Sequence, residues 1–208
     1  MGERRPALFA FDLDGTLLRG ETVCECIGRA IGRIEETKAF ESLTCRADIA
    51  AGRRTMLQWY RQHEQTVLLA TLKTARLAPG ARVALARLRS KGIKTALIST
   101  TWDFAVRHFA DELGADYAVG TGYLESGAVL DFWPEDKAAW LTDLLHKLNV
   151  SADAIVAVGD SAGDVPMLRL AGRGYFVGAG MPELPRHVRH WPDADIADLV
   201  DDAIGTAD

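Results

Sequence analysis

Short apolar runs alternate along this chain with segments of helical periodicity. Four runs are typical of strands, at residues 7–11, 95–98, 154–158 and 174–177. The first is apolar at every position, as expected of a strand buried on both faces of a parallel sheet. Apolar residues recur at helical spacing over 81–89, 102–113 and 137–148. The alternation predicts an α/β fold, with a Rossmann-like parallel sheet core wrapped by helices.

Residues 17–79 break this alternation. They show helical patterning alone, over 24–34, 49–62 and 67–77, and the stretch is too long for a plain crossover between two strands. We therefore expect an α/β core domain formed by 1–16 and 80–208, and a small helical cap domain formed by 17–79. A cap over the strand ends would exclude water and select the substrate. A second excursion, at 123–130, has a Ser-Gly turn between apolar flanks and predicts a hairpin.

Polar residues stand where the predicted strands end. Asp12 and Asp14 follow the first run, Ser99 the second and Asp160 the third. Open α/β sheets bind ligands in the crevice outside the carboxyl ends of their strands. We therefore expect these side chains, far apart in sequence, to converge on one site.

The DLDGT motif that begins at Asp12 has the chemistry of a metal and phosphate site. Asp12 and Asp14 repel each other when both are charged, so a cation between them is expected. Oxygen ligands near a phosphate favour Mg²⁺, and Asp160 can complete its coordination. An aspartate beside a metal is also a competent nucleophile toward phosphorus. Gly15 lets the backbone approach a phosphate closely, and Thr16 offers a hydroxyl and opens a turn whose N–H groups favour anions.

Later segments supply further polar groups. Ser99 offers a neutral hydrogen-bond donor to a phosphate oxygen. Lys137, which begins a helix, would neutralise phosphate as a point charge. The GDSAGD segment at 159–164 places two carboxylates four residues apart among small residues, directly after an apolar strand. Asp160 would face the metal, and Asp164 would orient Lys137 or a metal-bound water.

These motifs resemble those of phosphatases of the haloacid dehalogenase (HAD) superfamily, which carry DxDGT, a Ser or Thr, a Lys and GDxxxD in that order. The resemblance covers the whole chain, which has all four in the same order. It implies that Asp12 is a nucleophile that forms an aspartyl-phosphate, and that Asp14 is the general acid and base. It also implies Mg²⁺ as the cofactor, held by Asp12, the main-chain carbonyl of Asp14 and Asp160. Positioning and charge neutralisation would then supply most of the catalysis.

Within the superfamily the chain is most similar to phosphoserine phosphatases. Its expected cap lies between the first and second motifs, and its fourth motif continues as Val-Pro-Met-Leu. Glu21 lies nine residues after the nucleophile (21 − 12 = 9), and by this resemblance it would contact the amino group of the substrate. Arg61 is the candidate for binding the substrate carboxylate. Arg53 and Arg54 compete for that role, and an exposed helix charge is the plain alternative.

Two departures from the phosphoserine phosphatase pattern leave the substrate open. The second motif reads Ser-Thr-Thr-Trp from Ser99 where that family has Ser-Gly-Gly, and the first reads Asp-Gly-Thr where Asp-Ser-Thr is frequent. Two β-branched residues in place of glycines alter the pocket or its backbone path. The leading hypothesis is hydrolysis of phosphoserine or a similar amino-bearing ester. The alternatives are an ester of another amino alcohol, a sugar or a polyol, a phosphotransferase, and a non-catalytic regulatory protein, which would lack a catalytic carboxylate.

Composition and charge narrow the range of partners. With 208 residues, 48% of them hydrophobic and 25% charged, the chain has the composition of an ordinary globular protein. A formal net charge of −5 argues against nucleic-acid binding, and no apolar run approaches the length of a signal-peptide core or a membrane span. Three cysteines, an odd number, favour reduced thiols. We therefore expect a cytoplasmic monomer or homodimer that acts on a small phosphorylated metabolite, without nucleic acid or membrane.

Overall fold

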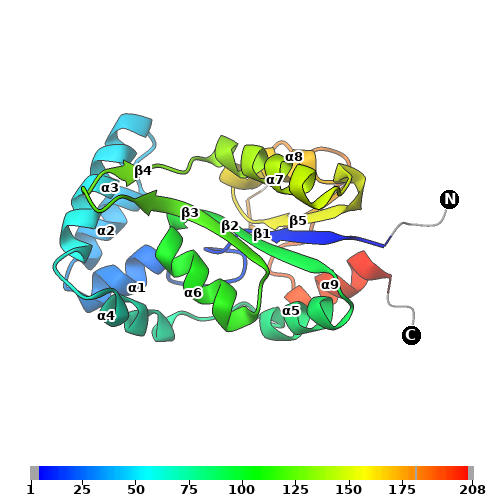
Figure 1. Ribbon diagram of the computed structural model, residues 1–208, viewed down its shortest axis with the longest axis horizontal. Coiled ribbons are helices and arrows are strands. Elements are labelled where there is room, and N and C mark those ends of the chain that lie inside the picture. Colours follow the sequence, from blue (N-terminus) through cyan, green and yellow to red (C-terminus); the bar gives the residue numbers. More distant parts are fainter. Residues whose placement is uncertain (1–4, 181, 206–208) are drawn as a thin grey trace.

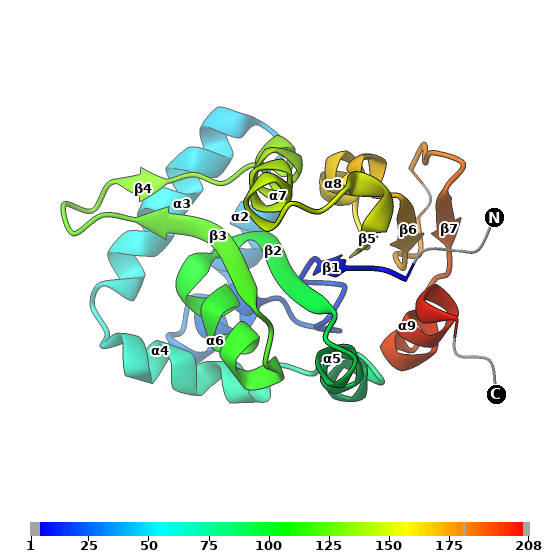
Figure 2. The same ribbon diagram turned by 45° about the vertical axis from the view of Figure 1, so that its right-hand side comes forward.

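The computed structural model describes residues 5–180 and 182–205. Over these residues seven strands form a single sheet in the order β4-β3-β2-β1-β5-β6-β7 (Figures 1 and 2). The strands are β1 (Leu8–Phe11), β2 (Lys94–Trp102), β3 (Tyr117–Tyr123), β4 (Val129–Leu130), β5 (Ile155–Gly159), β6 (Arg173–Phe176) and β7 (Val188–His190). All neighbouring strands are parallel except β3 and β4, which form an antiparallel hairpin. The predicted α/β fold is confirmed.

Helices cover both faces of this sheet. They are α5 (Ala81–Ser90), α6 (Asp103–Leu113), α7 (Pro134–Leu148), α8 (Val165–Leu170) and α9 (Ile196–Ile204). Phe9 and Phe11 of β1 belong to a core that α5, α6 and α9 complete, whereas Leu8 and Ala10 belong to a second core with α7 and α8. All four side chains are fully buried, so β1 is the central strand of three layers, as its uninterrupted apolar run predicts.

Four helices and a 3₁₀ turn lie between β1 and α5. They are α1 (Val23–Ala30), α2 (Ile34–Glu41), α3 (Arg46–Tyr60), α4 (Gln65–Thr71) and η1 (Leu72–Thr74). They gather at one end of the molecule, beyond the C-terminal end of β1 (Figure 1). The Arg19 N–H donates to the Arg76 carbonyl, and the Ala78 N–H to the Leu17 carbonyl, each at 2.8 Å. The chain therefore leaves the sheet and rejoins it at one place.

Local sequence sets the start of the two helices that approach the strand ends. Thr22 caps α1: its hydroxyl accepts from the Glu25 N–H, and the Glu25 carboxylate accepts from the Thr22 N–H, both at 3.0 Å. Helix α7 begins at Pro134, where a missing N–H costs nothing. Asp136 accepts from the N–H of Trp133 at 2.8 Å. These caps fix where the first turns of α1 and α7 point.

Three elements differ from the sequence-based expectations. The hairpin predicted at 123–130 is confirmed, but β3 begins at Tyr117 and pairs with β2 in the main sheet. Two glycines dilute its apolar signal, and at Gly120 a Cβ would lie 2.6 Å from the carbonyl oxygen of Thr101. Strand β7, of three residues, is too short for a recognisable pattern. Helix α2 buries only Thr37, so it has no apolar stripe to predict it.

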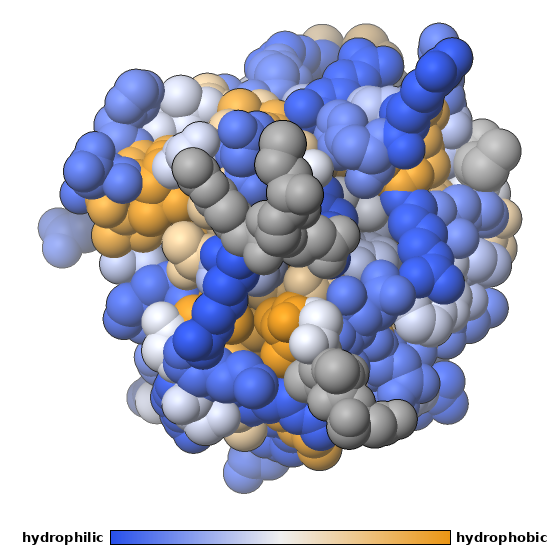
Figure 3. Space-filling model, turned by 90° about the vertical axis from the view of Figure 1, so that its right-hand side faces the viewer, coloured by the Kyte–Doolittle hydropathy of each residue, from blue (hydrophilic) through white to orange (hydrophobic). Residues whose placement is uncertain are grey.

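The end of the molecule opposite α1–α4 has a mostly hydrophilic surface. Apolar side chains on this face form small, separate areas among polar ones (Figure 3). In the described part of the chain, every helix is too short or too polar to cross a membrane.

Candidate active site

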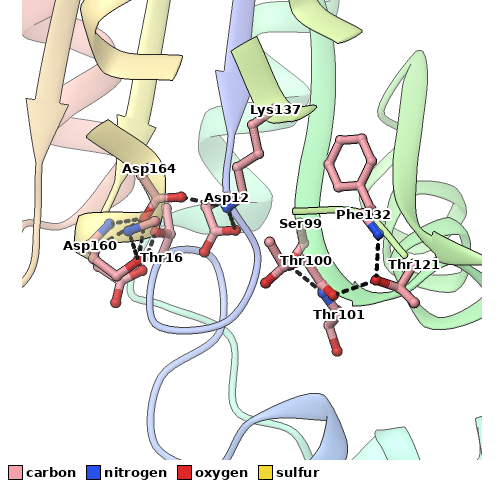
Figure 4. Close-up of polar contacts among 12 residues, drawn as sticks. Asp12, Thr16, Ser99, Thr100, Thr101, Thr121, Phe132, Lys137, Asp160 and Asp164 are labelled. Carbon is pink, nitrogen blue, oxygen red and sulfur yellow. Dashed lines mark hydrogen bonds and ion pairs between the residues drawn. The ribbon is translucent and has the colours of Figure 1, made fainter. Parts of the chain in front are cut away.

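The carboxyl ends of β1, β2 and β5 bring the predicted polar residues together (Figure 4). Asp12 follows β1, Asp160 follows β5, and Ser99 lies on β2, which pairs with β1. Lys137 reaches the same place from the first turn of α7. Asp164 ends the short 3₁₀ helix η3 (Ala162–Asp164) after β5. Sheet topology thus places side chains from distant parts of the sequence around one point.

Lys137 lies between two carboxylates in the interior. Its Nζ donates to Asp12 Oδ1 at 2.6 Å and to Asp164 Oδ1 at 2.5 Å. Lys137 is 2% exposed, Asp12 5% and Asp164 0%. Burial alone would lower the pKa of the ammonium group, but the two carboxylates outweigh burial and raise that pKa above its usual value. Lys137 therefore stays charged and holds Asp12 in one orientation.

Asp164 is fully engaged by the protein. Its Oδ2 accepts from the Asp160 N–H at 3.0 Å, and from the N–H and hydroxyl of Ser161 at 2.9 and 3.0 Å. Glycine is required at Gly159, because a Cβ there would lie 2.4 Å from the Cβ of Asp164. These contacts fix the carboxylate that accepts from Lys137. They also hold the backbone of Asp160.

The turn after Asp12 packs against Asp160. Gly15 has a left-handed φ of +81°, and a Cβ at this position would lie 2.1 Å from Asp160 Oδ2. The close approach expected of Gly15 is therefore made to a carboxylate. Thr16, expected at the phosphate, is fully buried, and its hydroxyl donates to Asp160 Oδ1 at 2.8 Å. The turn folds onto the loop after β5, so the Thr16 side chain supports Asp160 instead of facing a ligand.

Asp12, Asp160 and Asp164 form a cluster that fits a divalent cation. One oxygen from each lies within 4.8 Å of the others. Three carboxylates and the Lys137 ammonium group leave two negative charges (−3 + 1 = −2). Burial, together with repulsion from Asp164, raises the pKa of both Asp12 and Asp160. A bound Mg²⁺ would relieve this repulsion through oxygen ligands of the kind it prefers.

The carboxyl group of Asp14 lies apart from that cluster and lines a cavity. Its Oδ1 accepts from the Val23 N–H at the start of α1, at 2.8 Å. Burial raises the pKa of Asp14 to about 6, although hydrogen bonds from the Val23 N–H and the Thr101 side chain oppose the rise. A carboxyl group with such a pKa can both donate and accept a proton near neutral pH. A metal contact through the Asp14 main-chain carbonyl stays a prediction.

The end of β2 is irregular where threonines replace the expected glycines. The register between β2 and β3 shifts between Ile98 and Trp102. The Thr101 N–H donates to Ser99 Oγ at 3.4 Å, and the Thr100 carbonyl accepts from the Thr121 hydroxyl at 2.9 Å (Figure 4). A shift of this kind re-aims side chains beside a site. It accommodates the two β-branched residues while Ser99 still lines the cavity.

A cavity of about 480 Å³ opens beside Asp12. Asp12, Asp14, Ser99 and Lys137 line its sheet side. The helical segment contributes polar residues on the other side, namely Thr22, Cys24, Glu41 and Arg53. Apolar walls come from Phe40, Leu43, Ile49, Met56, Trp102 and Trp133. The helices α1–α3 and the strand ends thus enclose one space next to the buried carboxylates.

Comparison with known proteins agrees with this geometry. Residues 9–169 match the family of haloacid dehalogenase-like hydrolases. The chain belongs to this family. It is 31% identical over 186 residues to the phosphoserine phosphatase of Polaromonas sp., covering 79% of this chain and 76% of that protein. It is 27% identical to the phosphoserine phosphatase of Methanocaldococcus jannaschii, covering 82% of this chain and 84% of that protein.

Solved structures lead to the same family. A HAD family hydrolase of Salmonella enterica serovar Typhi is 27% identical, with a TM-score of 0.71, over 84% of this chain and 64% of that one. The chain therefore spans slightly less than two thirds of that hydrolase. A substrate-bound phosphoserine phosphatase shares the fold, with a TM-score of 0.78 at 22% identity, over 97% of this chain and 100% of that one. The predicted family is confirmed, and with it the class of phosphoric monoester hydrolases.

The positions of Glu21 and Arg61 differ from those the resemblance implies. Neither is among the described residues that line the cavity of this HAD hydrolase. Glu21 pairs with Arg29 at the surface, just after Gly20 turns the chain with a φ of +94°. Arg61, beyond the end of α3, donates to the Glu125 carbonyl in the hairpin turn at 3.0 Å. The packing of the helices, which motif spacing does not encode, directs both side chains away from the site.

Two other charged residues of the helical segment line the cavity, Glu41 and Arg53. The sequence offered Arg53, Arg54 and Arg61 as candidates for the substrate carboxylate, and spacing alone could not choose among them. Glu41 carries no motif and ends a helix that the pattern did not predict. Only the packing of α2 against α1 and α3 places Glu41 at the cavity.

Proposed function

We propose that this HAD hydrolase is a magnesium-dependent phosphomonoester hydrolase in which the carboxylate of Asp12 attacks phosphorus. The observation that carries the proposal is the buried chain of ion pairs from Asp12 through Lys137 to Asp164, beside the cavity. These ion pairs hold the nucleophile in one orientation. They also fix a positive charge where the phosphate oxygens of a substrate would lie.

Two steps follow from the positions of Asp12 and Asp14. In the first, an Asp12 oxygen bonds to phosphorus, the ester P–O bond breaks, and Asp14 gives its proton to the departing oxygen. In the second, Asp14 takes a proton from water as the water oxygen bonds to phosphorus. The bond between phosphorus and Asp12 then breaks, releasing inorganic phosphate. An Asp14 pKa of about 6 suits both transfers, and Ser99 and Lys137 would donate to phosphate oxygens throughout.

Asp12, Asp160 and the main-chain carbonyl of Asp14 would hold Mg²⁺. When bound, the ion supplies positive charge that stabilises the transferring phosphoryl group. Asp164 supports this set by orienting Lys137 and the backbone of Asp160. Thr16 supports it through its hydrogen bond to the Asp160 carboxylate.

The proposed substrate is a small amino-bearing phosphomonoester. The names of the relatives make phosphoserine the reference compound. The cavity supports an amino-bearing ester, because the carboxylate of Glu41 lines it. Transfer of the phosphoryl group to another alcohol is the alternative outcome of the second step. It would follow if a substrate hydroxyl replaced water beside Asp14.

Residues 17–79 would act as a cap domain over a core of 1–16 and 80–208. The shared exit and entry of this segment, and its contribution to the cavity wall, support that role. The cytoplasmic setting and the monomeric or dimeric state stay predictions.

Phosphate release from a panel of small phosphomonoesters tests the proposed function. The panel contains O-phosphoserine, aminoalkyl phosphates, and sugar and polyol phosphates, each with Mg²⁺ and with EDTA. We expect release that needs Mg²⁺ and is lost in Asp12→Asn, while circular dichroism and a cooperative unfolding transition show that the variant is folded. Release that continues unchanged in Asp12→Asn would overturn the nucleophile assignment. Added glycerol, with transfer product measured beside phosphate, separates hydrolysis from phosphotransfer.

A further inference from the structure

Two charged side chains of the cavity wall take no part in the proposed chemistry. Within the described residues these are Glu41, at the end of α2, and Arg53, on α3. Opposite charges of this kind would suit a substrate that carries both an ammonium group and a carboxylate, provided that both side chains were available to it. The contacts of the two residues show that the protein already compensates the charge of Arg53 but not that of Glu41.

The guanidinium group of Arg53 is committed to the protein. Its Nη1 pairs with Asp131 at 2.8 Å, and its Nη2 donates to the carbonyls of Thr100 at 3.0 Å and Phe132 at 3.3 Å. The group lies 4.5 Å from the ring centre of Trp133, and the side chain is 12% exposed. Its charge is compensated by Asp131 and its other donors are directed at two main-chain carbonyls, so binding a substrate carboxylate would require breaking these contacts.

Glu41 is held as an acceptor that faces the cavity. The Thr22 hydroxyl accepts the Glu25 N–H and donates to Glu41 Oε1 at 2.7 Å. The hydrogen-bond cap of α1 therefore orients the carboxylate of α2. Among the described residues, Glu41 pairs with no cationic side chain, and its hydrogen-bond partner is the Thr22 hydroxyl. Glu41 is exposed as a whole residue, but desolvation of its carboxyl group raises the pKa to about 7, and the neighbouring carboxylates of Asp14 and Glu25 add to the rise, as expected of a carboxylate without a cationic partner.

We infer that the substrate is a phosphomonoester whose alcohol part bears an ammonium group and no carboxylate, and that Glu41 binds this ammonium group. The inference rests on the proposed phosphatase function and names the substrate class of the same site. The inference assigns the ammonium contact to Glu41 of α2 in place of Glu21, which lies before α1 and outside the cavity. It also sets the substrate apart from phosphoserine, whose carboxylate would meet Glu41 and Asp14 without a free guanidinium group.

The remaining wall of the cavity carries uncharged side chains, which are threonines and Ser161 on the sheet side and apolar residues on the opposite side. Leu43, Ile49, Met56 and Trp102 line it, and such a surface favours a hydrocarbon spacer over a second charged group. The substrate class is therefore an aminoalkyl phosphate, in which methylene groups separate the phosphate from the ammonium group.

Matched pairs of esters test the inference. Each ω-aminoalkyl phosphate, with two to five carbons, is compared with the alkyl phosphate in which a methyl group replaces the ammonium group, and with O-phosphoserine. We expect the native protein to prefer the best aminoalkyl ester over its neutral partner by about tenfold in kcat/KM, the effect of one charge-assisted hydrogen bond. Glu41→Gln should abolish that preference through KM and leave the neutral ester unaffected. Glu35→Gln, on the same helix and outside the cavity wall, is the control and should keep it.

Binding to an inactive protein separates this inference from the proposed function. Calorimetric titration of Asp12→Asn with the same esters measures recognition without turnover. About tenfold weaker binding of the aminoalkyl ester in Asp12→Asn/Glu41→Gln, with unchanged binding of the alkyl ester, supports the inference even if the esters are not hydrolysed. Equal binding of both esters, or tighter binding of O-phosphoserine than of every aminoalkyl phosphate, would overturn it. Glu41→Lys should reverse the preference, in favour of 2-carboxyethyl phosphate.

Discussion

Lys137 is the residue on which the charge balance beside Asp12 depends. It is buried with two carboxylates, and removing one member of a buried ionic group leaves the others without compensation. Lys137→Met should therefore lower the free energy of unfolding by about 3 kcal/mol and reduce phosphate release by about 100-fold or more. Urea unfolding in EDTA and steady-state kinetics measure the two effects.

Lys94 provides the matched control for this substitution. It pairs with Asp116 at the surface, where such pairs contribute little. Lys94→Met should leave both the unfolding midpoint and the activity close to those of the native protein. Equal losses in the two variants would show that the buried position of Lys137 has no special role.

Alanine substitutions at Gly15 and Gly20 distinguish the effect of backbone strain from the effect of a collision with Asp160. Both have a left-handed φ, +81° and +94°, so either Ala substitution strains the backbone by about 1 kcal/mol. Only at Gly15 would the added Cβ collide with Asp160, since nothing lies within 4 Å of a Cβ at Gly20. Gly15→Ala should lose Mg²⁺ affinity and activity by about 100-fold, whereas Gly20→Ala should lose stability alone. Titration with Mg²⁺ followed by calorimetry distinguishes them, and comparable metal affinities would contradict this account.

The ionisation of Glu41 gives the aminoalkyl preference a pH dependence. Its pKa, raised to about 7, means that the carboxyl group is mostly neutral at pH 6 and mostly charged at pH 8. Because full ionisation gives a preference of about tenfold, the ratio of kcat/KM for an aminoalkyl phosphate to that for its alkyl partner should rise about fivefold between these values. The ratio cancels the effects of Asp14 and of the phosphate on the chemical step, which both esters share. In Glu41→Gln the ratio should not change with pH, and a rise in that variant would assign the dependence to another group.

At the scale of elements, the irregular end of β2 is tied to α3 through Arg53. The guanidinium group reaches the Thr100 carbonyl and Asp131 together, and a lysine cannot reproduce that fork. Arg53→Lys should release the end of β2, lower kcat/KM about tenfold and lower the melting temperature. Arg54→Lys, at an exposed position of the same helix, should do neither. Thermal melts and kinetics with and without Mg²⁺ measure the melting temperature and kcat/KM of both variants. Equal changes in the two variants would contradict the role of Arg53 in holding the end of β2.

The elements of the sheet could be predicted from the sequence more fully than those around the cavity. Strands β1 and β5 are apolar at nearly every position, and the carboxylates follow them directly, so pattern and site lie in adjacent residues. Strand β3 contains Gly120, which the close approach of Thr101 requires, and that requirement weakened its apolar signal. Helix α2 buries only Thr37, and its N-terminus has no side-chain cap that the sequence could reveal.

At the scale of the whole molecule, the buried carboxylates and the cavity wall depend on different kinds of information. Parallel strands place Asp12, Ser99 and Asp160 at the carboxyl-terminal edge of the sheet, independently of the loop conformations. The opposite wall depends on close helix packing: a Cβ at Gly28 would lie 2.3 Å from Thr37 Oγ1, and one at Gly52 would lie 3.2 Å from the Phe40 ring. Such contacts decide that Glu41, and not Glu21, lines the cavity. Spacing within one sequence does not reveal them.

The most direct test of the account is mass spectrometry of protein quenched in acid during turnover. With Mg²⁺ and the best ester of the panel, the peptide that contains Asp12 should gain the mass of one phosphoryl group, and hydroxylamine should remove it. Asp12→Asn should show no such gain. A phosphorylated peptide that lacks Asp12, or steady hydrolysis without any phosphorylated peptide, would contradict attack by Asp12.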